Sequence, residues 1–365
     1  MVQRANGRRA WAGLLAAAVA LALLPGAARA EQPHPFKGKR QVTVMTRNLY
    51  IGASLDPIFA AQTFPQLVGA VTTAFLEVQA TRFPERAQAI AGEIAETSPE
   101  VIGLQEVEII RTDTPADGAA TPAETVLYDY LDILLASLAA RGLHYAPVAV
   151  VQNSDTELPS ALGFDVRATD RDVILVRTDL RRADLKWRNP QAANFATNLT
   201  IPTLGGPITL LRGWNALDVK IRGKKFRLVN THLETEAAPP IQAAQALELL
   251  AGPGATSRPT LFIGDFNSQA DGLGTPTYGI LRAAGFGDAW SDTHPGDPGL
   301  TCCWEAHLLS PVPPFDERID LVLHRGGFTT LSAEIVGEDA AADRTPSGLF
   351  HSDHAGVVAT LQLTG

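Results

Sequence analysis

The sequence predicts an α/β fold built as one domain, and two observations predict it. Short apolar runs typical of buried strands alternate along the chain with stretches that have the periodicity of amphipathic helices. None of the Gly/Pro-rich stretches is long enough to divide the chain into separate domains. The 365 residues are 45% hydrophobic and 19% charged, which supplies a packed core and excludes a wholly disordered protein.

The first thirty residues are predicted to be a signal peptide that lies outside the fold. Three arginines precede an apolar run at 10–26, and Ala28-Arg29-Ala30 has the small residues of a cleavage site. A short membrane anchor is the alternative, but the run is a little short to span a bilayer. We therefore expect a secreted protein that is cleaved near Ala30.

Cleavage would make the chain more acidic. The full sequence has 30 basic and 39 acidic residues and a net charge of −9. Residues 1–30 hold four arginines and no acidic residue, so 26 basic and 39 acidic residues would remain, with a net charge of −13. Proteins that grip long nucleic acid normally present a basic surface, because phosphate contacts supply most of the affinity.

Strand and helix patterns follow each other in a regular order. Apolar runs predict buried strands at 42–50, 101–107, 145–151, 172–177, 226–233, 260–266, 318–324 and 355–361. A helix is expected over 84–96, where Pro84 suits the first turn, and another over 124–142, which ends at a glycine. A third helix, over 240–250, connects two of the strands, and Arg222-Gly223-Lys224 is typical of a hairpin turn.

Polar side chains gather where the apolar runs stop. One such residue alone is usually a turn former, but side chains from distant parts of a sequence converge at strand ends in an open sheet. The residues in these positions are Asn48, Gln105-Glu106, Asn230, His232, Asp265, Asn267 and Ser352-Asp353-His354. This combination of carboxylates, amides and histidines predicts an active site more readily than a set of turns.

These segments resemble the endonuclease/exonuclease/phosphatase superfamily, which includes DNase I-like nucleases, abasic-site endonucleases, inositol polyphosphate 5-phosphatases and bacterial sphingomyelinases. The matching motifs occur in the family's order: Arg47-Asn48, IGLQEV with Glu106, Asn230-Thr231-His232-Leu233, Gly264-Asp265-Phe266-Asn267, Arg318-Ile319-Asp320 and Ser352-Asp353-His354. The resemblance implies a four-layer α/β/β/α sandwich of two packed mixed sheets flanked by helices. It places the catalytic domain at 41–363, in a secreted, bacterial-type member.

The resemblance also implies a metal site. Glu106 is the principal Mg²⁺ ligand, Asn48 lies beside it, and Asp353 holds a second metal or its water. Hard oxygen ligands of this kind suit Mg²⁺, with Mn²⁺ as the alternative. Zinc is disfavoured because the only cysteines, Cys302 and Cys303, are adjacent. We expect these two as a vicinal disulfide or as two buried thiols.

The remaining roles follow from phosphoester chemistry and the resemblance. Asp265 would align or deprotonate the attacking water, and Asn267 would bind the phosphate. Asp320 would fix the tautomer of His354. His232 matches the general acid of the nuclease and sphingomyelinase branches.

Two further residues are predicted to contact the substrate. Asn230 begins the motif that contains His232. Arg171-Asp172 opens a strand where DNase-like members place polar groups for the substrate or for orienting a histidine. The alternative for Arg171 is a surface charge pair with Asp172.

Departures from the family narrow the choice of branch. Tyr50 stands where abasic-site endonucleases have an acid, and PPFDERID replaces the signatures of the 5-phosphatases. A metal-independent hydrolase would need a G-x-S-x-G turn, which is absent from the sequence. A catalytically silent binding module of the same fold remains an alternative, although the retained acidic and histidine positions argue against it.

The substrate is expected to be a phosphoester, with a preference for a small or lipid, sphingomyelinase-like phosphodiester over duplex DNA. The acidic net charge argues against DNA. The loop before Asp320 holds the apolar side chains Trp304, Leu308, Leu309, Val312 and Phe315, which would suit a lipid interface if exposed. A loop that merely covers the core is the alternative reading. A DNase I-like endonuclease, and so a nucleic acid partner, stays open, and no obligate protein partner is evident.

Overall fold

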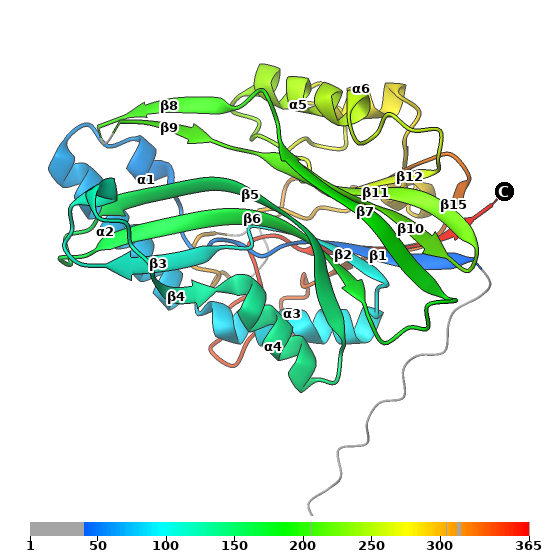
Figure 1. Cartoon of the computed structure of the whole chain (residues 1–365), viewed down its shortest axis with the longest axis horizontal. Coiled ribbons are helices and arrows are strands. Elements are labelled where there is room, and N and C mark those ends of the chain that lie inside the picture. Colours follow the sequence, from blue (N-terminus) through cyan, green and yellow to red (C-terminus); the bar gives the residue numbers. More distant parts are fainter. Residues whose placement is uncertain (1–39, 205, 304, 312–314, 365) are drawn as a thin grey trace, which may run out of the picture. The chain divides into compact units, whose positions relative to one another are not determined.

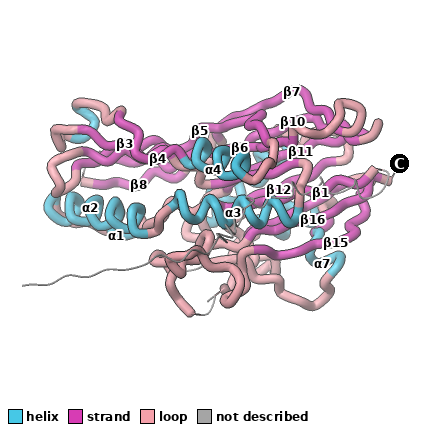
Figure 2. The backbone as a smooth tube through the Cα atoms, turned by 90° about the horizontal axis from the view of Figure 1, so that it is seen from below, coloured by secondary structure: helices cyan, strands magenta, loops and turns pink. Residues whose placement is uncertain are grey.

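The computed structural model describes residues 40–204, 206–303, 305–311 and 315–364, which belong to one compact unit. The predicted signal peptide lies outside the described residues. Two mixed β-sheets pack face to face, and helices cover the outer face of each sheet (Figures 1 and 2). Among the described helices, none is long and apolar enough to cross a membrane.

The first sheet has the order β15-β16-β1-β2-β6-β3-β4, and β5 pairs with β6 beside this path. Its strands are β1 (Gln41–Asn48), β2 (Val101–Gln105), β3 (Ile109–Asp113), β4 (Thr125–Asp129), β5 (Tyr145–Pro159), β6 (Asp165–Arg177), β15 (Phe328–Val336) and β16 (Gly356–Leu363). Strands β1 and β2 run parallel, so their carboxyl ends lie at the same edge of the sheet.

The second sheet has the order β13-β14-β12-β11-β10-β7. Its strands are β7 (Leu185–Asn194), β10 (Gly213–Ile221), β11 (Lys224–His232), β12 (Thr260–Asp265), β13 (Gly287–Asp288) and β14 (Asp320–Arg325). Here β11 and β12 are the parallel pair. A separate hairpin joins β8 (Leu199–Thr203) to β9 (Gly206–Leu210).

The helices complete the sandwich. They are α1 (Asp56–Phe59), α2 (Phe64–Ala80), α3 (Phe83–Thr97), the 3-10 turn η1 (Gly118–Ala120), α4 (Tyr130–Ala140), α5 (Pro239–Ala251), α6 (Thr277–Ala283) and α7 (Ala289–Thr293). Buried side chains of α3 and α4 pack on the outer face of the first sheet, and those of α5 and α6 pack on the second (Figure 1). A third core fills the space between the sheets. The predicted four-layer α/β/β/α sandwich is confirmed.

Each of the eight predicted strands is present, but β5 ends eight residues later and β6 begins seven residues earlier than predicted. The helix expected over 124–142 is wrong at its start, because 125–129 form β4 at the edge of the first sheet. Asp129 then caps α4, since its carboxylate accepts hydrogen bonds from the backbone N–H groups of Leu131 and Asp132. Residues of β4 pair with β3, and this tertiary pairing outweighs the helix propensity of the segment.

Two glycines allow the backbone and the sheets to approach closely near the strand ends. Gly264 has φ +147°, and a Cβ there would overlap the carbonyl oxygen of Thr231 on β11. Gly103 on β2 leaves the space that the Asn230 side chain occupies between the two sheets. Both glycines therefore serve the register that positions the polar residues.

Candidate active site

Strand register brings the predicted polar residues to one edge of the sandwich. His232 pairs with Asp265 across the parallel strands β11 and β12, and Asp265 pairs with Asp320 across β12 and β14. In the first sheet, Asn48 at the end of β1 pairs with Gln105 at the end of β2. Residues 352–354 come just before β16, the other neighbour of β1.

Asn48 links the two sheets at this edge. Its Nδ2 donates to Oε1 of Glu106 over 3.0 Å and to Oδ2 of Asp265 over 3.2 Å. Its Oδ1 accepts from the backbone N–H of Tyr50 at 2.9 Å. The other Glu106 oxygen, Oε2, accepts from the N–H of Ile51 at 2.7 Å. The carboxylates of the first and second sheets are thus held by one buried amide.

The backbone is left-handed at three positions around this amide. Tyr50, Glu106 and Asn267 have φ of 60°, 53° and 47°. Side chains other than glycine adopt this conformation at a cost of about 1 kcal/mol or more, and such residues cluster at functional sites. In Asn267 the bend brings its N–H to Oδ1 of Asp265 at 2.8 Å, which fixes that carboxylate.

Asp265 lies between the two predicted histidines. Its Oδ2 is 3.5 Å from Nε2 of His232 and 3.8 Å from Nε2 of His354. All three side chains are almost completely buried. A carboxylate with two imidazoles beside it can take a proton on one side while a histidine supplies one on the other.

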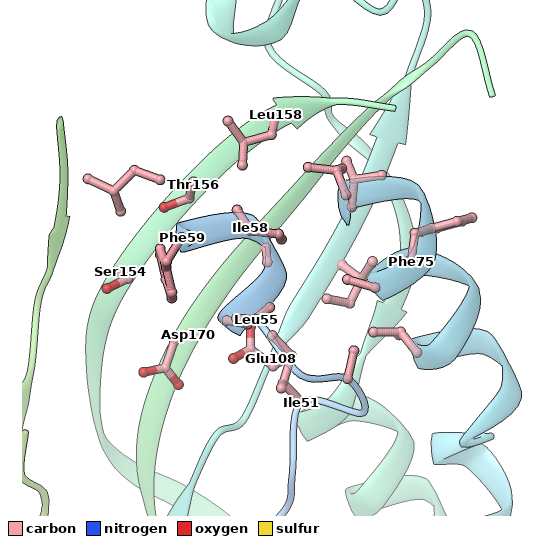
Figure 3. A pocket seen from close by; sticks show the side chains of 18 of the residues that line it. Ile51, Leu55, Ile58, Phe59, Phe75, Glu108, Ser154, Thr156, Leu158 and Asp170 are labelled. Carbon is pink, nitrogen blue, oxygen red and sulfur yellow. The ribbon is translucent and has the colours of Figure 1, made fainter. Parts of the chain in front are cut away.

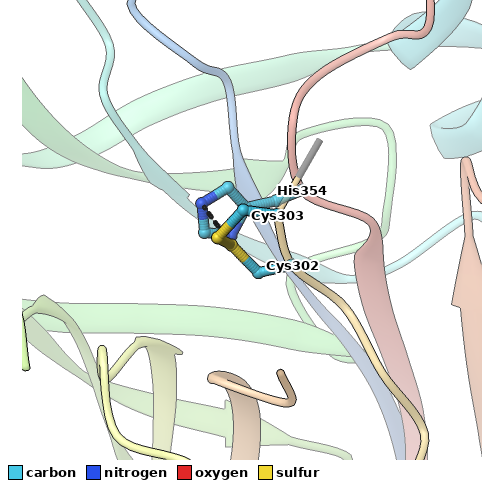
Figure 4. A group of neighbouring side chains, drawn as sticks. All are labelled: Cys302, Cys303 and His354. Carbon is cyan, nitrogen blue, oxygen red and sulfur yellow. Dashed lines mark hydrogen bonds between the residues drawn. A yellow bond between two sulfur atoms is a disulfide. The ribbon is translucent and has the colours of Figure 1, made fainter. Parts of the chain in front are cut away.

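His354 is held from behind by Asp320. Its Nδ1 is 2.9 Å from Oδ2 of Asp320, which places the proton of the neutral ring on Nδ1 and turns Nε2 toward Asp265. Asp353 Oδ1 is 3.9 Å from the same Nε2. Cys302 and Cys303 form a vicinal disulfide, and Sγ of the buried Cys302 lies 3.6 Å from Nε2 (Figure 4). The disulfide therefore forms part of the wall around this imidazole.

Comparison with known proteins agrees with this arrangement. The pattern of the Endonuclease/Exonuclease/phosphatase family matches residues 73–354, more than half of the chain. The chain belongs to this family. Its members are typically metal-dependent phosphoesterases or nucleases, and residues 73–354 include the candidate residues from Glu106 to His354.

Solved structures of other family members share the fold. A protein from Bacteroides vulgatus has a TM-score of 0.54 at 18% identity, over 89% of this chain and 100% of that one. One from Beutenbergia cavernae has 0.52 at 21%, over 90% and 72%. A humanized D. rerio TDP2 has 0.51 at 16%, over 88% and 99%. Such identities show a common fold, not a common substrate. A search of curated proteins found no match.

The two histidines of this family member have opposite electrostatic surroundings. Burial alone would lower the pKa of His354, but Asp320, Asp353 and Asp265 outweigh it and raise the pKa well above 6.5. Burial lowers the pKa of His232 well below 6.5, and Arg212 and His354 add to this. These surroundings favour the charged form of His354 and the neutral form of His232.

Arg212 adds to the effect of burial on the pKa of His232. Its Nη1 lies 3.0 Å from Nδ1 and 3.1 Å from Nε2, so the guanidinium lies against the ring and is not aimed at one nitrogen. A cation at this distance disfavours a second positive charge on the imidazole. This contact favours the neutral form of His232, and its role as the general acid stays a prediction.

The sequence prediction missed Arg212 and Asp170, which lie next to His232 together with Asp172 of the Arg171-Asp172 pair. The carboxylates of Asp170 and Asp172 and a ring nitrogen of His232 lie within 4.8 Å of one another. Asn153 donates to both carboxylates, at 3.1 and 2.9 Å. Burial raises the pKa of Asp170 to about 6, although Arg212 opposes the rise. The only available signal was the alternation of acidic residues at the start of the DVILVR strand.

Arg171 lies on the face of β6 that is turned away from His232. Asp170 and Asp172 face His232, so the alternation of the strand turns Arg171 to the opposite face of β6. Its guanidinium pairs with Asp129 at 2.7 Å and donates to the carbonyl of Val107 at 2.9 Å. With these partners the residue holds the segment that follows Glu106, and its predicted substrate contact stays a prediction.

Asn230 is also placed differently from its prediction. It is completely buried between the sheets, where Gln105 donates to its Oδ1 at 2.6 Å and its Nδ2 donates to the carbonyl of Leu104 at 3.2 Å. Its amide ties β11 to β2. Asn267 donates to the carbonyl of Leu233 at 3.0 Å and stays half-buried at the site.

Helix α3 supports the loops of the site from the outer face. Arg47 donates to both carboxylate oxygens of Glu93, at 3.0 and 2.9 Å, and also to the carbonyl oxygen of His354. Arg86, completely buried, donates to the carbonyls of Leu49 and His351 at 2.6 and 3.0 Å. The chain after β1 and the chain before β16 are therefore fastened to the same helix.

The donor set fits a hard divalent cation. Burial and the nearby Glu106 raise the pKa of Asp353 to about 7, and burial raises that of Asp265 to about 7. Asp320 Oδ1 is buried and has no hydrogen-bond partner among the described residues. Carboxylates crowded in this way are stabilised by a cation with oxygen preference. Glu106, Asn48 and Asp353 remain the predicted ligands, while the ligand atoms of Asp265, Asp320 and His354 lie within 4.8 Å of one another.

Proposed function

We propose that this protein is a secreted, Mg²⁺-dependent phosphodiesterase. The observation that carries the proposal is the position of Asp265, whose Oδ2 lies 3.5 and 3.8 Å from the two histidines. The same oxygen accepts from Asn48, which also binds Glu106. Asp265 therefore lies beside both histidines and beside Asn48, a predicted metal ligand. A carboxylate in this position can direct a water molecule at a metal-bound phosphate.

The reaction is a displacement at phosphorus. Mg²⁺ held by Glu106, Asn48 and Asp353 would neutralise the phosphoryl oxygens, with Mn²⁺ as a substitute. Asp265 accepts a proton from the water as its oxygen bonds to phosphorus. The ester P–O bond breaks, and His354 gives its Nε2 proton to the leaving oxygen.

The neutral His232 and Asn267 complete the site in this proposal. His232 donates a hydrogen bond to a phosphoryl oxygen and neither gains nor loses a proton in the reaction. Asn267 binds the phosphate from the β12 side. These preorganised donors stabilise the charge that develops on the phosphoryl group in the transition state.

The distribution of charge supports a small or lipid substrate over duplex DNA. The clearest basic group gathers Lys186, Arg188, Lys220, Lys225 and Arg258 around one hollow. Lys225 lies at the beginning of β11 and His232 at its end, roughly 23 Å apart along an extended strand. A DNA backbone held there would not lead directly to the reacting groups, so a DNase I-like activity is the second candidate.

The apolar loop before Asp320 contributes less to this preference than expected. Leu308 is completely buried, and Phe315 packs partly buried against the cluster around Tyr50 and Phe350. Leu309, 55% exposed, remains on the surface, and Trp304 and Val312 lie outside the described residues. The described part of the loop is a cover for this small core, and it presents no lipid-binding face.

Secretion is supported by the N-terminal sequence and by the disulfide. Structural disulfides persist in oxidising compartments and are rare in the cytosol. Detection of the chain in the medium, with an N-terminus at Glu31, would test this part of the proposal.

The substrate class is tested by comparing the rates of hydrolysis of DNA, a lipid and a small diester under the same conditions. Plasmid nicking, sphingomyelin cleavage and bis-p-nitrophenyl phosphate hydrolysis are compared at 150 mM salt, with Mg²⁺ and with EDTA. The proposal expects Mg²⁺-dependent hydrolysis of the small diester or the lipid, and slow nicking. Rapid nicking without the other two activities would favour the endonuclease.

A further inference from the structure

An apolar pocket lies beside the candidate active site and has no part in the mechanism above. It has a volume of about 130 Å³ and is enclosed by α1, α2, β3, β5, β6 and the β8–β9 hairpin. Most of its wall is aliphatic or aromatic, with Ile58 and Phe75 from the helices and Ile110 and Ala168 from the sheet. Figure 3 shows these walls, with Leu158 far from the two acidic side chains.

The polar end of the pocket is shared with the active site. Ile51 lines the pocket, and its N–H is the donor to Glu106 at 2.7 Å. Asp170 also lines the pocket, and its carboxylate lies within 4.8 Å of a ring nitrogen of His232. Glu108, two residues after Glu106, is the third lining residue at this end (Figure 3). A molecule with its phosphate at the metal ligands could therefore extend into the pocket.

The two carboxylates at this end mark the boundary between polar and apolar regions. Oε2 of Glu108 and Oδ1 of Asp170 are buried without a hydrogen-bond partner among the described residues. Beyond them, the pocket offers the hydroxyls of Ser154 and Thr156 and otherwise apolar side chains. A hydrocarbon chain binds favourably against such a lining, because its apolar surface is removed from water.

We infer that this pocket binds an apolar chain of the substrate, such as the alkyl or acyl chain of a lipid phosphoester. The inference rests on the proposed phosphodiesterase function, since the phosphate group positions the chain. Ile51, Glu108 and Asp170 connect the polar end of the pocket with Glu106 and His232, and the rest of its wall is largely apolar.

Alkyl phosphates provide the test. Butyl, hexyl, octyl and decyl phosphate, each below its micelle concentration, are measured as competitive inhibitors of bis-p-nitrophenyl phosphate hydrolysis. A buried methylene contributes enough to tighten binding about three- to fourfold. The inhibition constant is therefore expected to fall on the order of 100-fold from butyl to octyl phosphate, and then to level off when the pocket is full.

Substitutions in the wall separate the pocket from general apolar binding. Ala168→Phe fills the space from β6, and Ile208→Asp places a charge in it from β9, outside the two main sheets. Both should flatten the dependence on chain length. The matched control is Leu247→Phe, since Leu247 is 54% exposed on α5, away from the pocket, and should keep the full dependence.

The outcomes distinguish this inference from the proposed function. A flat series in the wild-type protein, or a steep series that survives both wall substitutions, would overturn the pocket assignment. If the small diester is not hydrolysed at all, the proposed function fails. Calorimetric titration of the wild-type and Ala168→Phe proteins with butyl and octyl phosphate then measures chain binding without catalysis, and equal affinities would again reject the pocket.

Discussion

Oδ2 of Asp320 lies 2.9 Å from Nδ1 of His354, and both side chains are almost completely buried. This pair connects β14 of the second sheet with the segment before β16 of the first. The contact raises the pKa of His354 and orients its free nitrogen toward Asp265. Much of the proposed chemistry depends on this orientation.

Removal of the charge on Asp320 should therefore impair catalysis without loss of the fold. Asp320→Asn is expected to lower kcat about 100-fold or more, the scale of a lost acid–base contact. The pKa of His354 should also fall. Since activity requires the protonated imidazole, the alkaline limb of the kcat/KM profile should move to lower pH. An unmoved limb in an active variant would show that His354 does not act as the acid.

The two histidines should respond differently to the leaving group. An alkoxide needs a proton to depart, whereas p-nitrophenolate does not. His354→Gln is expected to lose about 100-fold more activity on a dialkyl phosphate than on bis-p-nitrophenyl phosphate. His232→Gln should lose a similar factor on both, because it is neutral beside Arg212. The reverse pattern would restore His232 as the general acid.

The double variant of these histidines should also be informative. Both side chains lie next to the same Asp265 oxygen and serve one transition state. Their effects on kcat should therefore be less than multiplicative when combined. If both single variants keep wild-type rates, the histidines do not serve the reaction and their assignment is wrong.

Much of this site could be predicted from the sequence, because its residues sit at the ends of apolar runs. Parallel strands place their carboxyl ends at one edge, so Asn48, Glu106, His232 and Asp265 converge once the strands are assigned. Asp320 needs one further step, the pairing of β14 with β12. The order of the motifs was sufficient for that step.

The missed residues depend on contacts that no local pattern encodes. Arg212 precedes β10 outside any motif, and its contact with His232 requires two strands to pair first. Arg171 and Asp170 differ by one position, and a one-residue choice on a strand selects the opposite face. The apolar pocket needs α2, which was not predicted, to pack near β5 and β6.

The Arg47–Glu93 ion pair should make stability depend on pH. Burial raises the pKa of Glu93, but Arg47 and His351 outweigh it and hold the pKa below its ordinary 4.5. A depressed pKa stabilises the fold fully above pH 4.5, and this contribution is lost as the pH falls through the folded-state value.

Glu93→Gln should lower the free energy of unfolding by about 3 kcal/mol at pH 7, because it leaves Arg47 buried without its anion. The deficit should be unchanged at pH 5 and should shrink as urea unfolding is repeated at pH 4 and 3.5. Glu96→Gln, on the exposed side of the same helix, is the control. A deficit independent of pH would show that the charge of Glu93 is not what stabilises the fold.

Gly264 should tolerate no side chain. Gly264→Ala would place a Cβ against the Thr231 carbonyl at φ +147°, and the strain should shift both Asp265 and His232. We expect a loss of about 2 kcal/mol in stability and a loss of activity greater than the fraction unfolded explains. Gly279→Ala, which has nothing within 4 Å, should be close to neutral. Equal behaviour of the two variants would contradict the register argument.

The central claim is that Glu106 holds a metal ion required for phosphodiester hydrolysis. The direct measurement combines bis-p-nitrophenyl phosphate turnover in Mg²⁺ and in EDTA with Mn²⁺ binding, followed by electron paramagnetic resonance, for the wild type, Glu106→Gln and the exposed control Glu124→Gln. We expect Glu106→Gln to stay folded, bind Mn²⁺ weakly and lose activity by orders of magnitude, as the wild type does in EDTA, while Glu124→Gln resembles the wild type. Full turnover in EDTA, or in Glu106→Gln, would contradict the account.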